Sequence, residues 1–179
     1  MPTYIAILRG INVSGHKLIK MKALQEMFEH LGFSRVRTYI QSGNVAFEST
    51  LEETEKLEKI ISDGIQEHFS FVVPVIVLTG IELRHISENN KFVADRGEDQ
   101  TKLHVTILSA APQGNLIEAI PAKDFLPDEY YVTGKTVYLF CPQGYGNTKL
   151  SNNFFEKKLK VQATTRNWKT ILELVKLSD

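Results

Sequence analysis

Cysteine is almost absent from this sequence of 179 residues, since Cys141 is its only one. A lone cysteine excludes a disulfide within the chain and leaves no cysteine pair to bind zinc. The five histidines form no H-x-H or H-x-x-x-H pair, so we expect no metal site. Scarce cysteine is typical of proteins in a reducing compartment, and we therefore expect a cytoplasmic protein.

An excess of charge of either sign is also missing, because Lys plus Arg and Asp plus Glu are both 21. Binding to double-stranded nucleic acid requires many phosphate contacts, so a neutral chain argues against that partner and against a membrane surface. No apolar run is long enough to span a bilayer, and no leader-like segment precedes the first predicted strand. Residues 51–100 carry 11 acidic and 5 basic residues, which we interpret as a solvated surface.

What the first half does contain is a regular alternation of strand and helix patterns. Strands are predicted at 3–8, on both sides of a turn within 36–47, and at 74–78. Apolar residues with the spacing of an amphipathic helix predict helices at 21–31 and from about 50 to 69. The order β-α-β-β-α-β is that of the ferredoxin-like fold.

The second half repeats this plan without a convincing residue-level repeat. A strand at 102–108, a hairpin turning at 134–135 and a closing helix around Trp168 follow the same periods. We predict an α+β protein with two ferredoxin-like subdomains in tandem, the second with an extra C-terminal helix. The predicted boundaries are 1–90 and 102–179, with a polar linker at 91–101.

The sharpest local signal is the segment V-R-T-Y-I-Q-S-G-N-V-A-F at 36–47. We expect a two-residue turn drawn from Ser42, Gly43 and Asn44, because Gly and Asn tolerate positive φ. Alternation would then bury one face and leave a polar set on the other. The expected buried side chains are Thr38, Ile40, Val45 and Phe47, and the expected polar ones are Arg37, Tyr39, Gln41 and Asn44.

In the ferredoxin-like order, the ends of the first two strands share one rim of the sheet. The turn at 41–44 should therefore lie beside Arg9 and the loop G-I-N-V-S-G-H-K. This loop has the glycine spacing of a phosphate-binding P-loop, but His16 takes the position of the motif's lysine. Lys17 comes one place late, and Leu18 follows it where a Ser or Thr would stand, so we expect no NTP hydrolysis there. Its N–H groups with Arg9 and Lys17 could bind an anion, or its glycines could serve only a tight turn.

A second glycine-containing loop, P-Q-G-Y-G-N-T-K, ends at Lys149. Together with Arg166 and Asn167 it could hold a phosphate or carboxylate, although Asn167 could instead cap the last helix. Cys141 ends an apolar strand, and we expect a buried, inert thiol rather than a nucleophile.

Four motifs, taken in order, resemble the bacterial family called domain of unknown function 1697. They are I-L-R-G-I-N-V-S-G-H-K, R-T-Y-I-Q-S-G-N-V-A-F, Y-G-N-T-K-L-S and A-T-T-R-N-W-K-T. The resemblance covers nearly the whole chain and implies a pair of ferredoxin-like subdomains in a cytoplasmic bacterial protein. It implies no activity, because the family has no assigned reaction.

We therefore hypothesise that the protein binds a small anionic ligand, such as a nucleotide, a phosphate or a carboxylate compound, at these rims or in a cleft between the subdomains. Two alternatives stay open: an enzyme acting on a phosphorylated or carboxylated small molecule, and a protein-interaction module. The candidate ligand-binding residues are Arg9, Gly10, Asn12, Gly15, Lys17, Gln41, Ser42, Asn44, Lys149, Arg166 and Asn167.

Overall fold

The computed structural model describes all 179 residues. The chain forms two compact units, one made of Met1–Arg84 with Glu173–Asp179 and the other of His85–Leu172. The chain passes from the first unit to the second within helix α3 (Gly80–Glu88) and returns within helix α7 (Trp168–Ser178).

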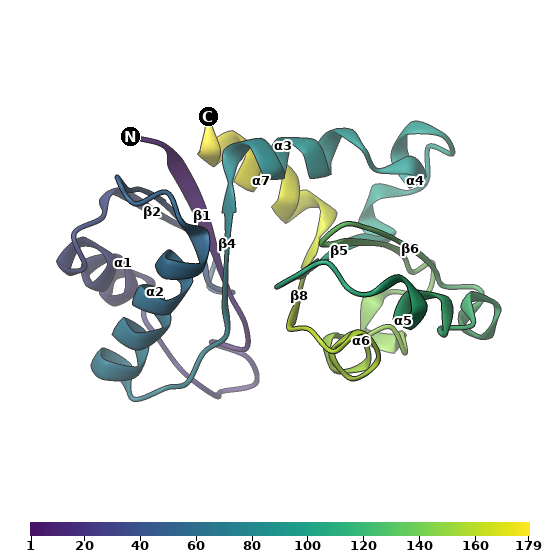
Figure 1. Cartoon of the computed structure of the whole chain (residues 1–179), viewed down its shortest axis with the longest axis horizontal. Helices are drawn as coiled ribbons and strands as arrows, with labels where there is room; N and C mark the ends of the chain where they lie inside the picture. Colours follow the sequence, from purple (N-terminus) through teal and green to yellow (C-terminus); the bar gives the residue numbers. More distant parts are fainter. The chain divides into compact units, whose positions relative to one another are not determined.

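The first unit contains one antiparallel sheet of four strands in the order β2-β3-β1-β4. This is the strand order of the ferredoxin-like fold, with the third strand between the first two. Two helices connect the strands (Figure 1). The elements are β1 (Thr3–Leu8), α1 (Met21–His30), β2 (Ser34–Tyr39), β3 (Asn44–Glu48), α2 (Thr54–Phe69) and β4 (Val75–Thr79).

Helices α1 and α2 pack on one face of this sheet because each buries one apolar stripe. Phe28 of α1 lies within 5.4 Å of Phe47 of β3, measured between ring centroids, in an edge-to-face arrangement. Leu57 and Ile61 of α2 are fully buried in the same core. Strand residues alternate, so Val45 and Phe47 face this core as predicted.

Along β1, β3 and β4 the opposite face of the first sheet is also buried, which explains why β1 and β4 are almost entirely apolar. The last residues of α7 belong to this unit, where Arg37 Nη2 donates a 2.7 Å hydrogen bond to the Leu177 carbonyl. An added Cβ on Gly80 would lie 3.3 Å from Ser178, so the chain end packs closely against the start of α3.

The hairpin turn differs from its prediction. Asn44 pairs with Tyr39, so the loop has four residues, 40–43, and not two. The even number of loop residues preserves the predicted faces of the strands. Ile40, however, leaves the strand with φ at +49° and a side chain 48% exposed, and Asn44 is buried, so these two placements were wrong.

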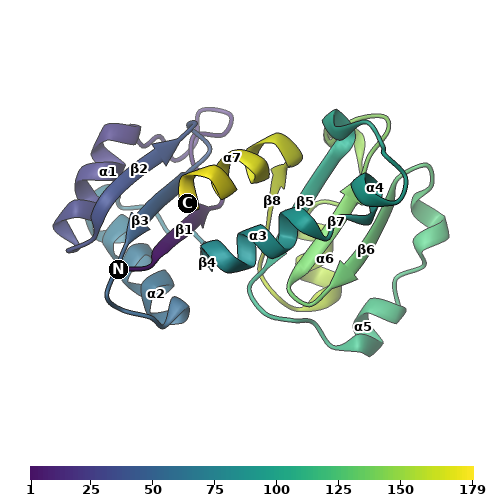
Figure 2. The same cartoon turned by 90° about the horizontal axis from the view of Figure 1, so that it is seen from above.

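The second unit contains another antiparallel sheet of four strands, in the equivalent order β6-β7-β5-β8 (Figure 2). The prediction of two ferredoxin-like subdomains is therefore confirmed. Helices α5 and α6 supply apolar side chains to the core on one face of this sheet. The elements are β5 (Leu103–Leu108), α5 (Gly114–Glu118), β6 (Glu129–Thr133), β7 (Thr136–Phe140), α6 (Asn152–Leu159) and β8 (Ala163–Asn167).

Residues 91–101, which the sequence predicts as a linker, lie inside the second unit. They include α4 (Lys91–Ala94), capped by the Asn90 side chain, which accepts from the Phe92 N–H at 3.0 Å. Phe92 is 5% exposed and contacts Tyr131 and Phe140. A single buried aromatic residue thus anchors a segment whose other residues are mostly polar.

Candidate functional site

The loop between β1 and α1 is a small β-hairpin of its own. Val13 and His16 form an antiparallel bridge, and the His16 N–H donates to the Val13 carbonyl at 2.9 Å. Ser14 and Gly15 between them have φ values of +51° and +75°. Positive φ at both central residues is the signature of a type I′ turn. Gly15, the second glycine of the spacing that resembles a P-loop, therefore serves a tight turn at the tip of this loop.

Asn12 fixes the base of the hairpin loop. Its Nδ2 donates to the carbonyls of Ile19 and Gln41, both at 2.9 Å, and its Oδ1 accepts from the Ile19 N–H at 2.8 Å. The residue itself has φ at +55°, a conformation that Asn tolerates better than most residues. Its amide thus joins the loop to the β2–β3 turn and has a structural role.

The two loops lie side by side, as the rim prediction requires. The Leu8 N–H donates to the Gly43 carbonyl at 2.8 Å. A Cβ on Gly43 would approach both Ile11 Cδ1 and Leu8 Cβ to 2.8 Å, so only glycine fits there. On the other side of the loop, Lys17 Nζ donates to the Val72 carbonyl at 2.7 Å.

The candidate residues of this rim differ in their exposure to solvent. The Asn44 amide is buried and donates to the Tyr39 carbonyl at 3.1 Å and to Ser42 Oγ at 3.0 Å. The Gln41 side chain is exposed, and Arg9 is half-buried. We name the surface formed by residues 9–22, 40–43 and 70–74 the first rim.

The first rim is rich in basic residues and contains no acidic residue. Two lysines that sequence reasoning missed, Lys20 and Lys22, are exposed and form no ion pair. Lys20 occupies the N-cap of α1, where no side chain bonds to the helix, and the first turn has no acidic residue. The positive end of the helix dipole thus adds to the positive charge. The sequence feature that could have indicated this charge is a lysine at the N-cap of a helix, where Ser, Thr, Asp or Asn is usual.

Four exposed apolar side chains interrupt this basic surface. Val13 and Leu18 are 55% and 66% exposed on the loop, and Ile40 and Val72 are 48% and 68% exposed on its neighbours. The first rim therefore combines positive charge with apolar area.

The candidate residues of the second unit do not all line one pocket. Lys149 borders a pocket of about 160 Å³ whose other charged residues are Asp124 and Asp128. Arg166 and Asn167 do not line it. Two carboxylates beside one ammonium make this pocket a poor receptor for an anion.

Arg166 and Asn167 have local roles. The Asn167 Oδ1 accepts from the Thr170 N–H at 2.8 Å, so this residue caps α7, the alternative reading of the sequence. Arg166 Nη1 donates to the Thr165 carbonyl at 3.0 Å. Arg166 is partly buried, and desolvation of its guanidinium lowers its pKa to about 10.

Cys141 is a free and fully buried thiol. Burial raises its pKa to about 11, which disfavours the thiolate that a nucleophile requires. No group of three His, Cys, Asp or Glu side chains is arranged to hold a metal ion. None of the helices combines the length and the apolar character that crossing a membrane requires.

Comparison with known proteins supplies a family and a fold. Residues 1–138 match the model of the family described as protein of unknown function (DUF1697). The chain belongs to this family. A conserved bacterial protein, SP0830 from Streptococcus pneumoniae, has a similar solved structure, with a TM-score of 0.71, 22% sequence identity and 99% coverage of both chains. The comparison with curated proteins finds no match.

Proposed function

We propose that this DUF1697 protein is a binding protein for a small anionic ligand, and that the first rim holds the ligand. The observation that supports this most is the charge distribution. Arg9, Lys17, Lys20 and Lys22 lie within 14 consecutive residues that include no Asp or Glu, although the whole chain has no net charge. Folding alone does not require this separation.

The backbone of the first rim supports the same ligand class. The N–H groups of Ser14 and Gly15, at the tip of the loop, donate to no other group of the protein, and the α1 N-terminus lacks a side-chain cap. Backbone N–H groups and lysine ammonium groups both favour phosphate or carboxylate oxygens. The exposed Val13 and Leu18 provide apolar contact area for a ligand larger than the anion itself.

The test uses inorganic phosphate and AMP as probes, followed through the backbone amide resonances of residues 9–22. We expect both probes to shift these resonances, and AMP to bind more tightly because its ring system covers the apolar side chains. The K20Q/K22Q variant should weaken binding by on the order of fivefold to tenfold, since each exposed ion pair between a lysine and the anion is worth a few tenths to 1 kcal/mol.

The matched control is K56Q/K59Q, which removes the same charge from the exposed face of α2, where Lys59 pairs with Asp63 at 2.6 Å. This control should bind both probes as the parent protein does. Equal weakening in both double variants would mean that only net charge matters, and the proposal would fail. Resonances of the first rim that stay unchanged in millimolar AMP would also refute it.

A further inference from the structure

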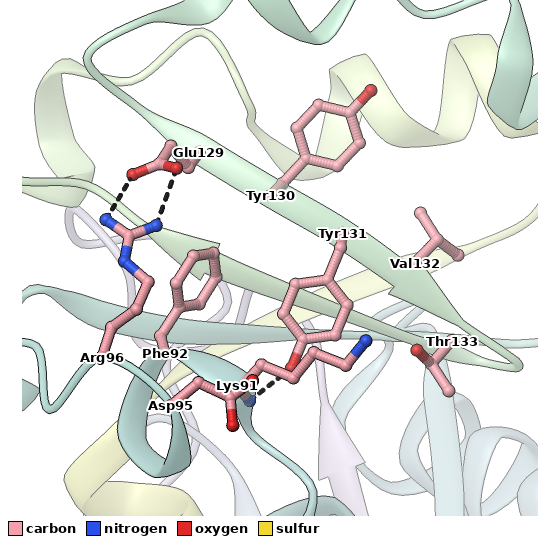
Figure 3. Close-up of a pocket in the computed structure, with 9 residues that line it drawn as sticks. All are labelled: Lys91, Phe92, Asp95, Arg96, Glu129, Tyr130, Tyr131, Val132 and Thr133. Atoms are coloured by element: carbon pink, nitrogen blue, oxygen red, sulfur yellow. Dashed lines mark hydrogen bonds and ion pairs between the residues drawn. The ribbon is translucent and has the colours of Figure 1, made fainter.

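A shallow pocket of about 490 Å³ lies along strand β6 of the second unit (Figure 3). All five residues of the strand, Glu129–Thr133, line it. Side chains alternate between faces, and Tyr130 and Val132 pack toward the core beneath α5 and α6. A pocket lined by residues of both faces extends along the backbone of the strand, which has one unpaired edge.

That edge carries unpaired backbone groups. β6 is the outermost strand of its sheet and pairs only with β7. The turn between β6 and β7 has two residues, so the pair that flanks it, Thr133 and Thr136, is a hydrogen-bonded pair. Hydrogen-bonded pairs alternate with non-hydrogen-bonded ones along the ladder, so Tyr131 and Tyr138 also form a hydrogen-bonded pair. The N–H and C=O of Tyr130 and Val132 then point outward, and no hydrogen bond joins them to another segment.

The two edge strands of the first sheet, β2 and β4, are blocked. In β4, the Val77 N–H donates to the Glu58 carboxylate at 2.9 Å, which occupies the edge. In β2, the register shifts between Ser34 and Arg37, and Arg35 has φ at +47°. Such a bulge twists an edge away from pairing. β6 has neither a side chain bonded to its edge nor a bulge, so its edge is open to an additional strand.

The side of the pocket is rigid and aromatic. The Tyr131 hydroxyl accepts from the Lys91 N–H at 2.7 Å and donates to the Asn89 carbonyl at 3.1 Å, and its ring stacks on Tyr138 at 4.8 Å. Arg96 is held by Glu129 through two hydrogen bonds of 2.8 Å. A pre-ordered surface of this kind loses little entropy when a ligand binds.

One positive charge in the pocket remains without a carboxylate partner. Lys91 Nζ lies 5.5 Å from the centroid of the Tyr131 ring and forms no ion pair. Figure 3 shows its side chain extended past Tyr131 toward Thr133, while the Asp95 carboxylate points away from it. The charge of Arg96, by contrast, is offset by Glu129 and Glu98.

We propose that the edge of β6 binds an extended peptide segment of another protein as a fifth strand of the second sheet. Backbone hydrogen bonds to Tyr130 and Val132 provide the attachment, as in other cases of strand addition. An acidic side chain of the peptide pairs with Lys91, and an apolar or aromatic side chain two residues away covers Tyr131. This site shares no residue with the first rim, and the proposal does not depend on the function proposed there.

The probe is the peptide acetyl-Ser-Thr-Glu-Thr-Phe-Thr-Ser-amide, whose glutamate and phenylalanine lie on one face of a strand. We expect it to shift the amide resonances of Glu129–Thr133. Two versions, N-methylated at the odd or at the even positions, separate strand addition from side-chain binding. Only one of the two should lose binding, because only one edge of the peptide faces β6. Equal binding, or equal loss, of both versions would overturn the proposal.

Two variants of the protein complete the test. Val132→Pro removes one outward N–H while Val132→Ala retains it, so proline should weaken binding by up to about tenfold relative to alanine. Lys91→Glu should reverse the preference of the protein from the glutamate peptide to its lysine counterpart, and this variant does not change the strand. If sedimentation detects a dimer of the parent protein that the Val132→Pro variant does not form, β6 pairs with a second copy of the chain, and the proposal would also be overturned.

Discussion

Replacing Asn12 by alanine removes three hydrogen bonds that hold the first rim together. The two bonds to Ile19 are partly buried and the one to the Gln41 carbonyl is exposed. Partly buried bonds contribute about 1 kcal/mol each, and an exposed one less. Alanine is also disfavoured at a φ of +55° by roughly 1 kcal/mol. Together, these effects predict that Asn12→Ala destabilises the first unit by about 3 kcal/mol.

Two further substitutions divide this loss into its parts. Asn12→Gly loses the same bonds but tolerates the left-handed backbone, so its destabilisation should be about 2 kcal/mol. Asn12→Asp retains an oxygen for the Ile19 N–H but places a carboxylate oxygen against two carbonyls. It should therefore destabilise the protein while leaving the Ile19 N–H bonded.

The assay is urea unfolding followed by the amide resonances of β1, which report the first unit alone, together with hydrogen exchange of the Ile19 N–H. That N–H should exchange faster in the Ala and Gly variants and remain protected in the Asp variant. Asn115→Ala is the control, because the Asn115 side chain is exposed and forms no hydrogen bond. An Asn12→Gly variant with parental stability and an unchanged Ile19 exchange rate would refute the structural role of Asn12.

Two other predictions concern a glycine of the first unit and an ion pair of the second unit. Gly43→Ala should destabilise the protein by about 3 kcal/mol, because the new Cβ would lie 2.8 Å from Leu8 Cβ at a φ of +85°. Gly10→Ala meets no atom within 4 Å, so it should cost only about 1 kcal/mol of backbone strain in the same urea titration. Arg96 hydrogen bonds to Glu129 and lowers the pKa of that carboxyl below its ordinary value of 4.5. The ion pair therefore stabilises the fold above pH 4.5 and ceases to do so as the pH falls through the lowered pKa, so Glu129→Gln should flatten stability over that range. Unfolding titrations of parent and variant that stay parallel below pH 4.5 would contradict this assignment.

The sequence predicts the fold of each unit well because the spacing of apolar residues and the order of the elements can be read directly along the chain. Apolar stripes at helical spacing specify α1 and α2, and alternation specifies the strands that they cover. The shared rim followed from topology alone, and the bond from Asn12 to the Gln41 carbonyl confirms it.

Side-chain roles within the rims were less predictable, since they depend on contacts between residues far apart in the sequence. Asn12 and Asn44 carry amides suited to a ligand, yet both are engaged by the protein itself. Ile40 was expected to be buried because isoleucine favours strands, but the chain turns there in a conformation that β-branched residues rarely adopt. The sequence did not indicate Lys20 and Lys22 as candidates, because a charged residue on a helix usually does no more than face solvent.

The last seven residues, Glu173–Asp179, belong to the first unit, although 88 residues of the second unit separate them from Arg84. A ribosome therefore finishes the second unit before it delivers the segment that completes the first. Until then Arg37 lacks the Leu177 carbonyl. For the same reason, no single cut in the chain releases the first unit whole, and a shortened version must supply the end of α7 through an artificial connection.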